Sequence, residues 1–127
     1  MQTEQGNTIN FEEVEYHHFK CGTIFENLDR LIETTHNLEQ LLDTFFFETQ
    51  SWLSSDGMSF SNEPRRINYE VGSRSRNRCH YRLFCGVNYL GELSFSRATR
   101  FSLEELELVE ELLAVLSSPL QVAVVHK

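Results

Sequence analysis

The stretch RCHYRLFCGVNYLGELSFS, residues 78–96, alternates apolar and polar side chains in two runs that a short Gly-Val-Asn segment separates. The apolar positions of these runs are Cys79, Tyr81, Leu83, Cys85, Tyr89, Leu93 and Phe95. Successive side chains of a β-strand point to opposite faces of the sheet, so a period of two indicates a strand with one buried face. The stretch therefore predicts a β-hairpin that is apolar on one face and polar on the other.

Two further strands are predicted upstream of this hairpin. Residues 58–61 and 66–71 show the same alternation, and residues 72–77 form a short polar connection to the hairpin. Four runs of this kind are typical of an antiparallel meander with one wet face. The side chains expected on the wet face are Arg66, Asn68, Glu70, Arg78, His80, Arg82, Glu92 and Ser94.

Helical periodicity precedes these strands. Thr23 and Glu26 have the spacing of a capping box, and apolar residues then recur at helical intervals as far as Ile32. A second start at Asn37 begins a stripe that continues to Trp52. The pattern predicts two helices, or one long bent helix, before turn residues at 54–57.

The last helix is marked by Ser102 and Glu105, which form a second capping box. One apolar stripe along it comprises Leu106, Val109, Leu113, Leu116 and Leu120, and a second comprises Leu108, Leu112 and Val115. Pro119 predicts either a kink or a new helix start. We expect the first stripe to cover the sheet, and the second to stay exposed in a single chain and to form a homodimer interface with Pro119. The alternative is that the preceding helices cover both stripes.

The composition limits the possible partners. The chain has 127 residues, enough for one domain, and a net charge of -8, which disfavours nucleic acid and anionic membranes. Its N-terminus lacks the pattern of a secretion signal, and three cysteines do not make a disulfide framework. We therefore expect a cytoplasmic protein with a loosely ordered lead-in over residues 1–20 and one domain over residues 21–127.

The segments at 89–97 and 101–120 resemble the last strand and last helix of GAF domains, and residues 37–53 resemble their long first helix. The sequence FSLEEL at 101–106 and the Pro119-Leu120 step are similar to GAF domains that precede GGDEF domains in bacterial diguanylate cyclases. The resemblance implies an α+β, GAF-like fold (the PAS fold is its cousin), with N-terminal helices and a long C-terminal helix on one face of an antiparallel sheet. It also implies a final helix, residues 102–127, that leads into a GGDEF-type output domain.

The sequence departs from the ligand-binding members of that family at the connection between its central strands. Residues 72–77 are too short for the helical lid that covers a GAF pocket, and the signature of cyclic-nucleotide GAF domains is absent. We therefore expect no conventional buried pocket and no cofactor.

Arginines are concentrated in the strand region, and a guanidinium fork suits carboxylate and phosphate groups. If a small anionic ligand or nucleotide binds, the expected residues are Arg74, Arg76, Arg78, His80 and Arg82. The alternatives are a solvated face or a docking surface.

Two other readings of the sequence are less favoured. Cys79 and Cys85 suggest a redox pair like that of GAF-fold methionine sulfoxide reductases, but six residues of extended strand span about 20 Å, too far for a disulfide. His17, His18 and Cys21, with His36 or His80, lack the spacing of a metal site, so no metal is expected. The leading hypothesis is a non-catalytic regulatory and dimerisation domain of a bacterial cyclic di-GMP signalling protein.

Overall fold

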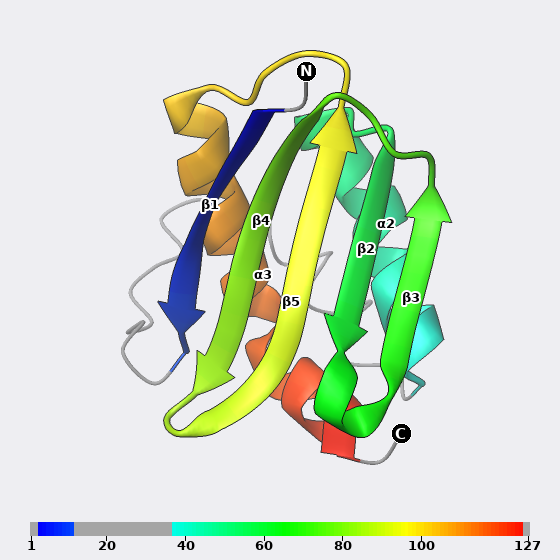
Figure 1. Cartoon of the computed structure of the whole chain (residues 1–127), viewed down its shortest axis with the longest axis vertical. Coiled ribbons are helices and arrows are strands. Elements are labelled where there is room, and N and C mark those ends of the chain that lie inside the picture. The colour runs from blue at the N-terminus through cyan, green and yellow to red at the C-terminus, as the bar shows by residue number, and fades with distance from the viewer. Residues whose placement is uncertain (1–2, 12–36, 126–127) are drawn as a thin grey trace.

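The computed structural model describes residues 3–11 and 37–125, and Figure 1 shows their arrangement. A sheet forms one layer and two helices form the second layer behind it (Figure 1). The α+β class predicted from the sequence is confirmed. The elements in chain order are β1 (Thr3–Asn10), α2 (Leu38–Leu53), β2 (Gly57–Asn62), the short 3-10 helix η1 (Glu63–Arg65), β3 (Ile67–Gly72), β4 (Asn77–Cys85), β5 (Asn88–Arg97) and α3 (Leu103–Val125).

The five strands form one mixed sheet in the order β1-β4-β5-β2-β3. The four predicted strands are confirmed, but the predicted meander is wrong, because β5 pairs with β2 and the chain crosses from β3 to β4 over the end of the sheet (Figure 1). Phe60 of β2 and Leu93 and Phe95 of β5 are fully buried, whereas Tyr69 and Val71 of β3 are only partly buried. The more apolar strands therefore lie in the middle, and β3 lies at an edge.

The loose lead-in expected over residues 1–20 is wrong for Thr3–Asn10, which forms β1. This strand runs parallel to β4, with Thr3 opposite Asn77 and Asn10 opposite Phe84. The Asn10 amide fixes the end of β1 by donating to the Gly86 carbonyl at 3.2 Å and accepting from the Gly86 N–H at 2.9 Å. Backbone ladder bonds need no apolar pattern, so the mostly polar segment gave little sequence signal.

Helix α2 begins where the sequence predicts. The Asn37 side-chain oxygen accepts the N–H groups of Glu39 and Gln40 at 2.8 and 3.2 Å, which satisfies two donors of the first turn. Ser54 ends the helix in the left-handed conformation. Its buried residues are Leu38, Leu41, Leu42, Phe45, Phe46, Thr49 and Leu53. The earlier helix predicted near residues 24–32 lies outside the described residues.

Helix α3 has the predicted capping box. The Ser102 N–H donates to Glu105 at 2.8 Å, and the Glu105 N–H donates to the Ser102 hydroxyl at 3.1 Å. The helix continues through Pro119 as one element to Val125. By length and composition it could cross a membrane, with a mean hydropathy of 1.7 over its most apolar window, but half of that window is buried inside the protein. Core helices pass the same test, so this is weak evidence for a membrane span.

The second apolar stripe of α3 is not exposed, contrary to the sequence-based expectation. Leu112 is fully buried and Val115 is 8% exposed, while Leu108 and Pro119 are partly buried. Helix α3 contacts both β5 and α2, so both of its stripes have partners within the chain. The expected dimer interface of Leu108, Leu112, Val115 and Pro119 therefore belongs mainly to the core.

Candidate functional site

Both described helices cover the same face of the sheet, and no described element covers the other (Figure 1). We call this second face the open face. Cross-strand pairing places His80, Ser94, Ser59 and Glu70 in one row across β4, β5, β2 and β3. The two central strands contribute serines to this row, and the outer strands contribute longer polar side chains. The middle of the open face is therefore hollow.

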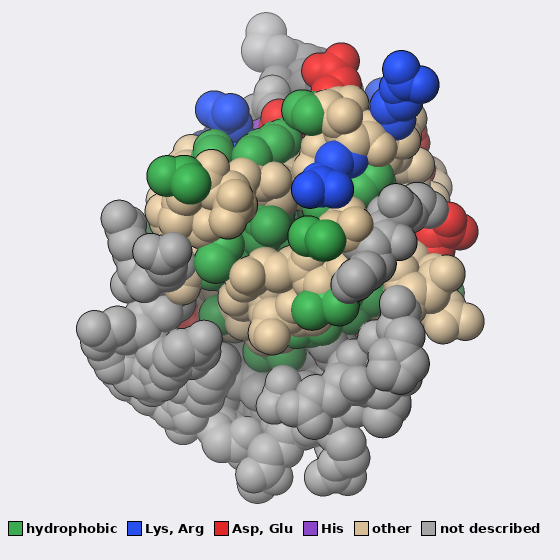
Figure 2. Space-filling model, turned by 90° about the horizontal axis from the view of Figure 1, so that it is seen from below, with side chains coloured by type: hydrophobic (Ala, Val, Ile, Leu, Met, Phe, Trp, Pro, Cys, Tyr) green, Lys and Arg blue, Asp and Glu red, His purple; other side chains and the backbone are tan. Residues whose placement is uncertain are grey.

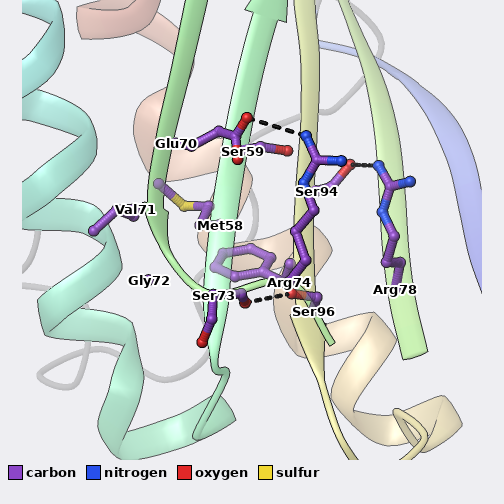
Figure 3. A pocket seen from close by; sticks show the side chains of 11 residues that line it. Met58, Ser59, Glu70, Val71, Gly72, Ser73, Arg74, Arg78, Ser94 and Ser96 are labelled. Atoms are coloured by element: carbon purple, nitrogen blue, oxygen red, sulfur yellow. Dashed lines mark hydrogen bonds and ion pairs between the residues drawn. The ribbon is translucent and has the colours of Figure 1, made fainter. Parts of the chain in front are cut away.

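A cavity of about 130 Å³ occupies this hollow (Figure 3). Its polar lining comprises Ser59, Glu70, Ser73, Arg74, Arg78, Ser94 and Ser96. In Figure 3 the guanidinium groups of Arg74 and Arg78 lie on either side of Ser94. The cavity is smaller than the ~300–1,000 Å³ of sites for drug-sized ligands, so it suits a small molecule or ion.

The crossover between β3 and β4 carries Arg74 to this position. Its backbone passes close to the start of β2, where the Ser73 N–H donates to the Asp56 carbonyl at 3.0 Å. The Ser75 hydroxyl donates to the Asp56 carboxylate at 2.6 Å, and the Ser96 hydroxyl donates to the Ser73 carbonyl at 3.2 Å. These bonds hold the short crossover against the end of the sheet.

Two glycines allow this close approach. A Cβ at Gly57 would lie 2.3 Å from the Ser73 carbonyl oxygen, and one at Gly72 would lie 2.2 Å from the Asp56 carbonyl oxygen. Gly72 also has a φ of +72°, in the region that favours glycine. The sequence GSRSRN, residues 72–77, thus encodes a tight crossover that places an arginine over the sheet.

The side chains of the open face form one separate ion pair and one connected network. Arg74 forms a salt bridge with Glu70 at 3.0 Å, and Arg78 donates to the Ser94 hydroxyl at 3.1 Å. His80 Nδ1 lies 2.8 Å from Ser94 Oγ, and His80 Nε2 lies 2.7 Å from a carboxylate oxygen of Glu92. Through its two ring nitrogens, His80 thus links the Ser94 hydroxyl to the Glu92 carboxylate.

Glu92 is the acidic centre at the other end of the network. Burial alone raises the pKa of its carboxyl, but hydrogen bonds from Tyr89 and His80 and the charges of His80 and Arg82 outweigh it and lower the pKa below its ordinary value. The Tyr89 hydroxyl donates to Glu92 at 2.9 Å. Glu92 is therefore held in its charged form.

Ser94, His80 and Glu92 follow the order of a nucleophile, a base and an orienting acid. Acyl transfer by such a set also needs donors that stabilise the developing oxyanion. Ser94 lies in the middle of β5, which pairs with β4 on one side and β2 on the other, and its side chain is buried. The backbone donors of β5 are thus committed to the sheet and do not form an oxyanion hole beside Ser94.

The sequence-predicted ligand residues separate into three groups. Arg74 and Arg78 line the cavity, and His80 adjoins it through Ser94. Arg82 instead lies 5.7 Å from the centre of the Phe84 ring and 5.9 Å from that of Tyr89. Arg76 is exposed and lies outside the lining.

Sequence reasoning missed Ser59 and Ser96 as site residues and treated Glu70 and Ser94 only as wet-face positions. The three serines had one signal in the sequence, which was a small polar residue at alternate positions of β2 and β5. That signal becomes specific only when the strand order is known, because β2 and β5 are neighbours in the sheet and not in the chain.

The cysteine and metal readings gain no support from the described residues. Burial raises the pKa of the Cys79 thiol to about 12, although hydrogen bonds and nearby arginines act in the opposite direction. Within residues 3–11 and 37–125, no three or more His, Cys, Asp or Glu side chains are grouped as metal ligands would be. His17, His18, Cys21 and His36 lie outside these ranges.

Comparison of the chain with protein-family models, curated proteins and solved structures finds no match. The resemblance to GAF domains therefore stays a prediction from the sequence, and function has to be argued from the site itself.

Proposed function

We propose that this chain is a non-catalytic regulatory domain that binds a small anionic ligand in the cavity of the open face. The observation that carries the proposal is the convergence of Arg74 and Arg78 over a floor of serine hydroxyls (Figure 3). Guanidinium groups present several N–H donors in one plane, which matches the oxygens of a carboxylate or phosphate.

The charge balance of the cavity supports an anion. Two arginines and one carboxylate, that of Glu70, line it. The Glu70–Arg74 pair is exposed to water, with 80% of the Arg74 side chain accessible, so the pair is weak and Arg74 can turn towards a ligand at little cost. An anion bound between the two guanidiniums would offset the remaining positive charge.

A contiguous path connects the cavity with α3, which supports a regulatory role. Ser96 lines the cavity, and the next residue, Arg97, forms a salt bridge with Glu105 in the first turn of α3. A ligand that shifts the end of β5 would therefore act directly on the start of the helix. Coupling of this kind requires two arrangements of the element that carries it.

Calorimetric titration with acetate, inorganic phosphate and sulfate tests the binding proposal. We expect at least one anion to bind, and Arg74→Ala and Arg78→Ala each to weaken that binding. Arg76→Ala is the matched control, because Arg76 is exposed on the same crossover and lies outside the cavity. Equal losses in all three variants would indicate non-specific attraction to positive charge and would contradict the proposal.

Dimerisation is a second candidate role, favoured by the last turns of α3. Val122 and Val125 are 58% and 59% exposed at helical spacing, unlike the stripe that the sequence pointed to. Figure 2 shows the end of the molecule where α3 finishes, with apolar side chains spread among polar ones. As part of this proposal, two copies would pair through the end of α3 in a cytoplasmic diguanylate cyclase and bring two GGDEF-type output domains together.

Light scattering over a range of concentrations tests this role. We expect the wild-type chain to form a dimer. The double variant Val122→Glu, Val125→Glu should be a folded monomer. A dimer that survives this double substitution would show that the interface lies elsewhere. A monomer at every concentration would remove dimerisation through this chain.

A further inference from the structure

We propose that the ligand of the open face is a small α-amino acid, bound as a zwitterion with its carboxylate between Arg74 and Arg78 and its ammonium group on Glu70 and Ser59. This inference rests on the proposed function, because it names the ligand of the same cavity. It follows from the presence of both signs of charge in one small cavity.

A ligand that carries only negative charge would make no favourable contact with the part of the cavity formed by Glu70 and Ser59. Glu70 lies on the wall, where its carboxylate would repel a purely anionic ligand. Among the described residues it bonds only Arg74, through one oxygen, and its second oxygen remains available. The neighbouring Ser59 hydroxyl takes part in none of the hydrogen bonds of the described chain. Together these two side chains provide acceptors for an ammonium group.

The opposite end of the cavity provides donors. Arg78 donates to Ser94, and Arg74 reaches from the crossover to the space between Glu70 and Ser94 (Figure 3). A guanidinium carries five N–H donors and can bond several partners at once, so both arginines can contribute donors to the two oxygens of one carboxylate.

The spacing of the donors and acceptors matches an α-amino acid. Ser94 pairs with Ser59, and Ser59 pairs with Glu70, so these groups lie on three adjacent strands. Neighbouring strands are about 4.8 Å apart, and the carboxylate and ammonium of an α-amino acid are joined through a single carbon. Once the exposed Arg74 turns from Glu70 towards the ligand, the carboxylate can therefore lie over Ser94 while the ammonium lies over Ser59 and Glu70.

The volume limits the side chain of the ligand. The cavity of about 130 Å³ is close to the ~150 Å³ cavity that accommodates benzene, a molecule of six non-hydrogen atoms like L-alanine. Glycine, L-alanine and L-serine fit this size. A nucleotide is far larger, so the nucleotide expected as an alternative from the sequence is not favoured.

Calorimetric titration of the full chain with four probes tests the inference: L-alanine, acetate, alaninol and inorganic phosphate. Acetate lacks the ammonium group and alaninol lacks the carboxylate. We expect L-alanine to bind at least tenfold more tightly than either. Glu70→Gln should weaken the binding of L-alanine at least tenfold. It should leave the binding of acetate unchanged or make it tighter, because the substitution removes the repulsion between the Glu70 carboxylate and the anion. Arg78→Ala should weaken the binding of both L-alanine and acetate, and Arg76→Ala should change the binding of neither.

The outcomes separate the two proposals. Binding of acetate or phosphate that depends on Arg78, with L-alanine no tighter, would overturn the amino-acid inference and keep the anion site. Absence of binding by all four probes would overturn both. Ser59→Ala provides a second variant that removes one ammonium acceptor without changing charge, and an unchanged affinity for L-alanine in both Ser59→Ala and Glu70→Gln would also overturn the inference.

Discussion

The guanidinium of Arg97 and the carboxylate of Glu105 form a two-pronged salt bridge, with N···O distances of 2.5 and 2.8 Å, where the chain passes from β5 into α3. The same guanidinium donates to the carbonyls of Leu53, Thr99 and Arg100 and lies 4.2 Å from the centre of the Phe101 ring. It is 8% exposed. One side chain thus ties the end of α2, the end of β5 and the start of α3 together.

Replacing Arg97 by Met should lower the free energy of unfolding by about 2–4 kcal/mol, because it leaves the Glu105 carboxylate and several carbonyls without their donor. Urea unfolding measures the change. The double variant with Glu105→Gln should lose less than the sum of the two single variants. Strictly additive losses would contradict the coupling seen in the structure.

Glu105 should make the domain sensitive to acid. The hydrogen bonds from Arg97 lower the pKa of its carboxyl most strongly and, despite some burial, bring it from an ordinary value of 4.5 to about 2. Because the folded-state pKa lies below that of the unfolded chain, the carboxylate stabilises the fold fully above pH 4.5 and loses this effect as the pH falls towards 2.

Urea unfolding at a series of pH values checks this effect. Glu105→Gln should make the decline between pH 4.5 and 2 shallower without abolishing it, since the lowered pKa of Glu92 acts in the same direction. An unchanged slope in the variant would contradict the role of Glu105.

Gly72→Ala should destabilise the domain by about 2 kcal/mol or more, because its backbone conformation and its contact with Asp56 both exclude a Cβ. Thermal unfolding measures the loss. The neighbouring Ser73→Ala is the control, since Ser73 uses its backbone N–H and carbonyl in the contacts described, and it should stay within about 0.5 kcal/mol of the wild type. Similar losses in both variants would argue against the tight crossover.

Leu112→Ala should cost about 2–5 kcal/mol, as expected for a fully buried leucine. Val122→Ala, on the exposed part of the same helix, should change stability by about 0.5 kcal/mol or less. Chemical denaturation of the two variants compares them directly. If Leu112→Ala left stability unchanged but dissociated a dimer, the interface read from the sequence would be right after all.

Cys79 should resist thiol reagents in the folded domain, because its side chain is fully buried and burial raises its pKa to about 12. In a Cys21→Ser background at pH 8, we expect the partly buried Cys85 to react first and Cys79 to react only in denaturant. Mass spectrometry of the labelled peptides identifies the site. A Cys79–Cys85 disulfide on mild oxidation would contradict the structure.

The elements with strong local signals could be predicted from the sequence, and those that depend on long-range pairing could not. Alternation gave the four strands, and the side chains of Asn37 and Ser102 marked two helix starts. Nothing local distinguishes a meander from the observed strand order, because both bury the same apolar faces. The burial of Leu112 depends on where α2 lies, and a heptad-like stripe looks the same in a core and in a dimer.

The candidate site divides in the same way. The arginine-rich segment at 74–78 was recognisable from composition, and two of its arginines do line the cavity. The floor of the site could not be predicted, since Ser59 and Ser94 are brought together only by the pairing of β2 with β5. The prediction that Arg82 belongs to the same site is not supported, because Arg82 lies beside the Phe84 and Tyr89 rings and outside the cavity lining.

The pairing of β1 with β4 sets the order in which the chain can fold during synthesis. Thr3 emerges from the ribosome long before its partner Asn77, and at about 5–20 residues per second the delay is on the order of 4–15 s. Until then β1 has no strand to pair with, whereas the β2–β3 hairpin closes as soon as it is made. Strand β1 is therefore translated well before its partner β4 and is among the last strands to be secured, so a fusion partner that restrains β1 should slow the final step of folding.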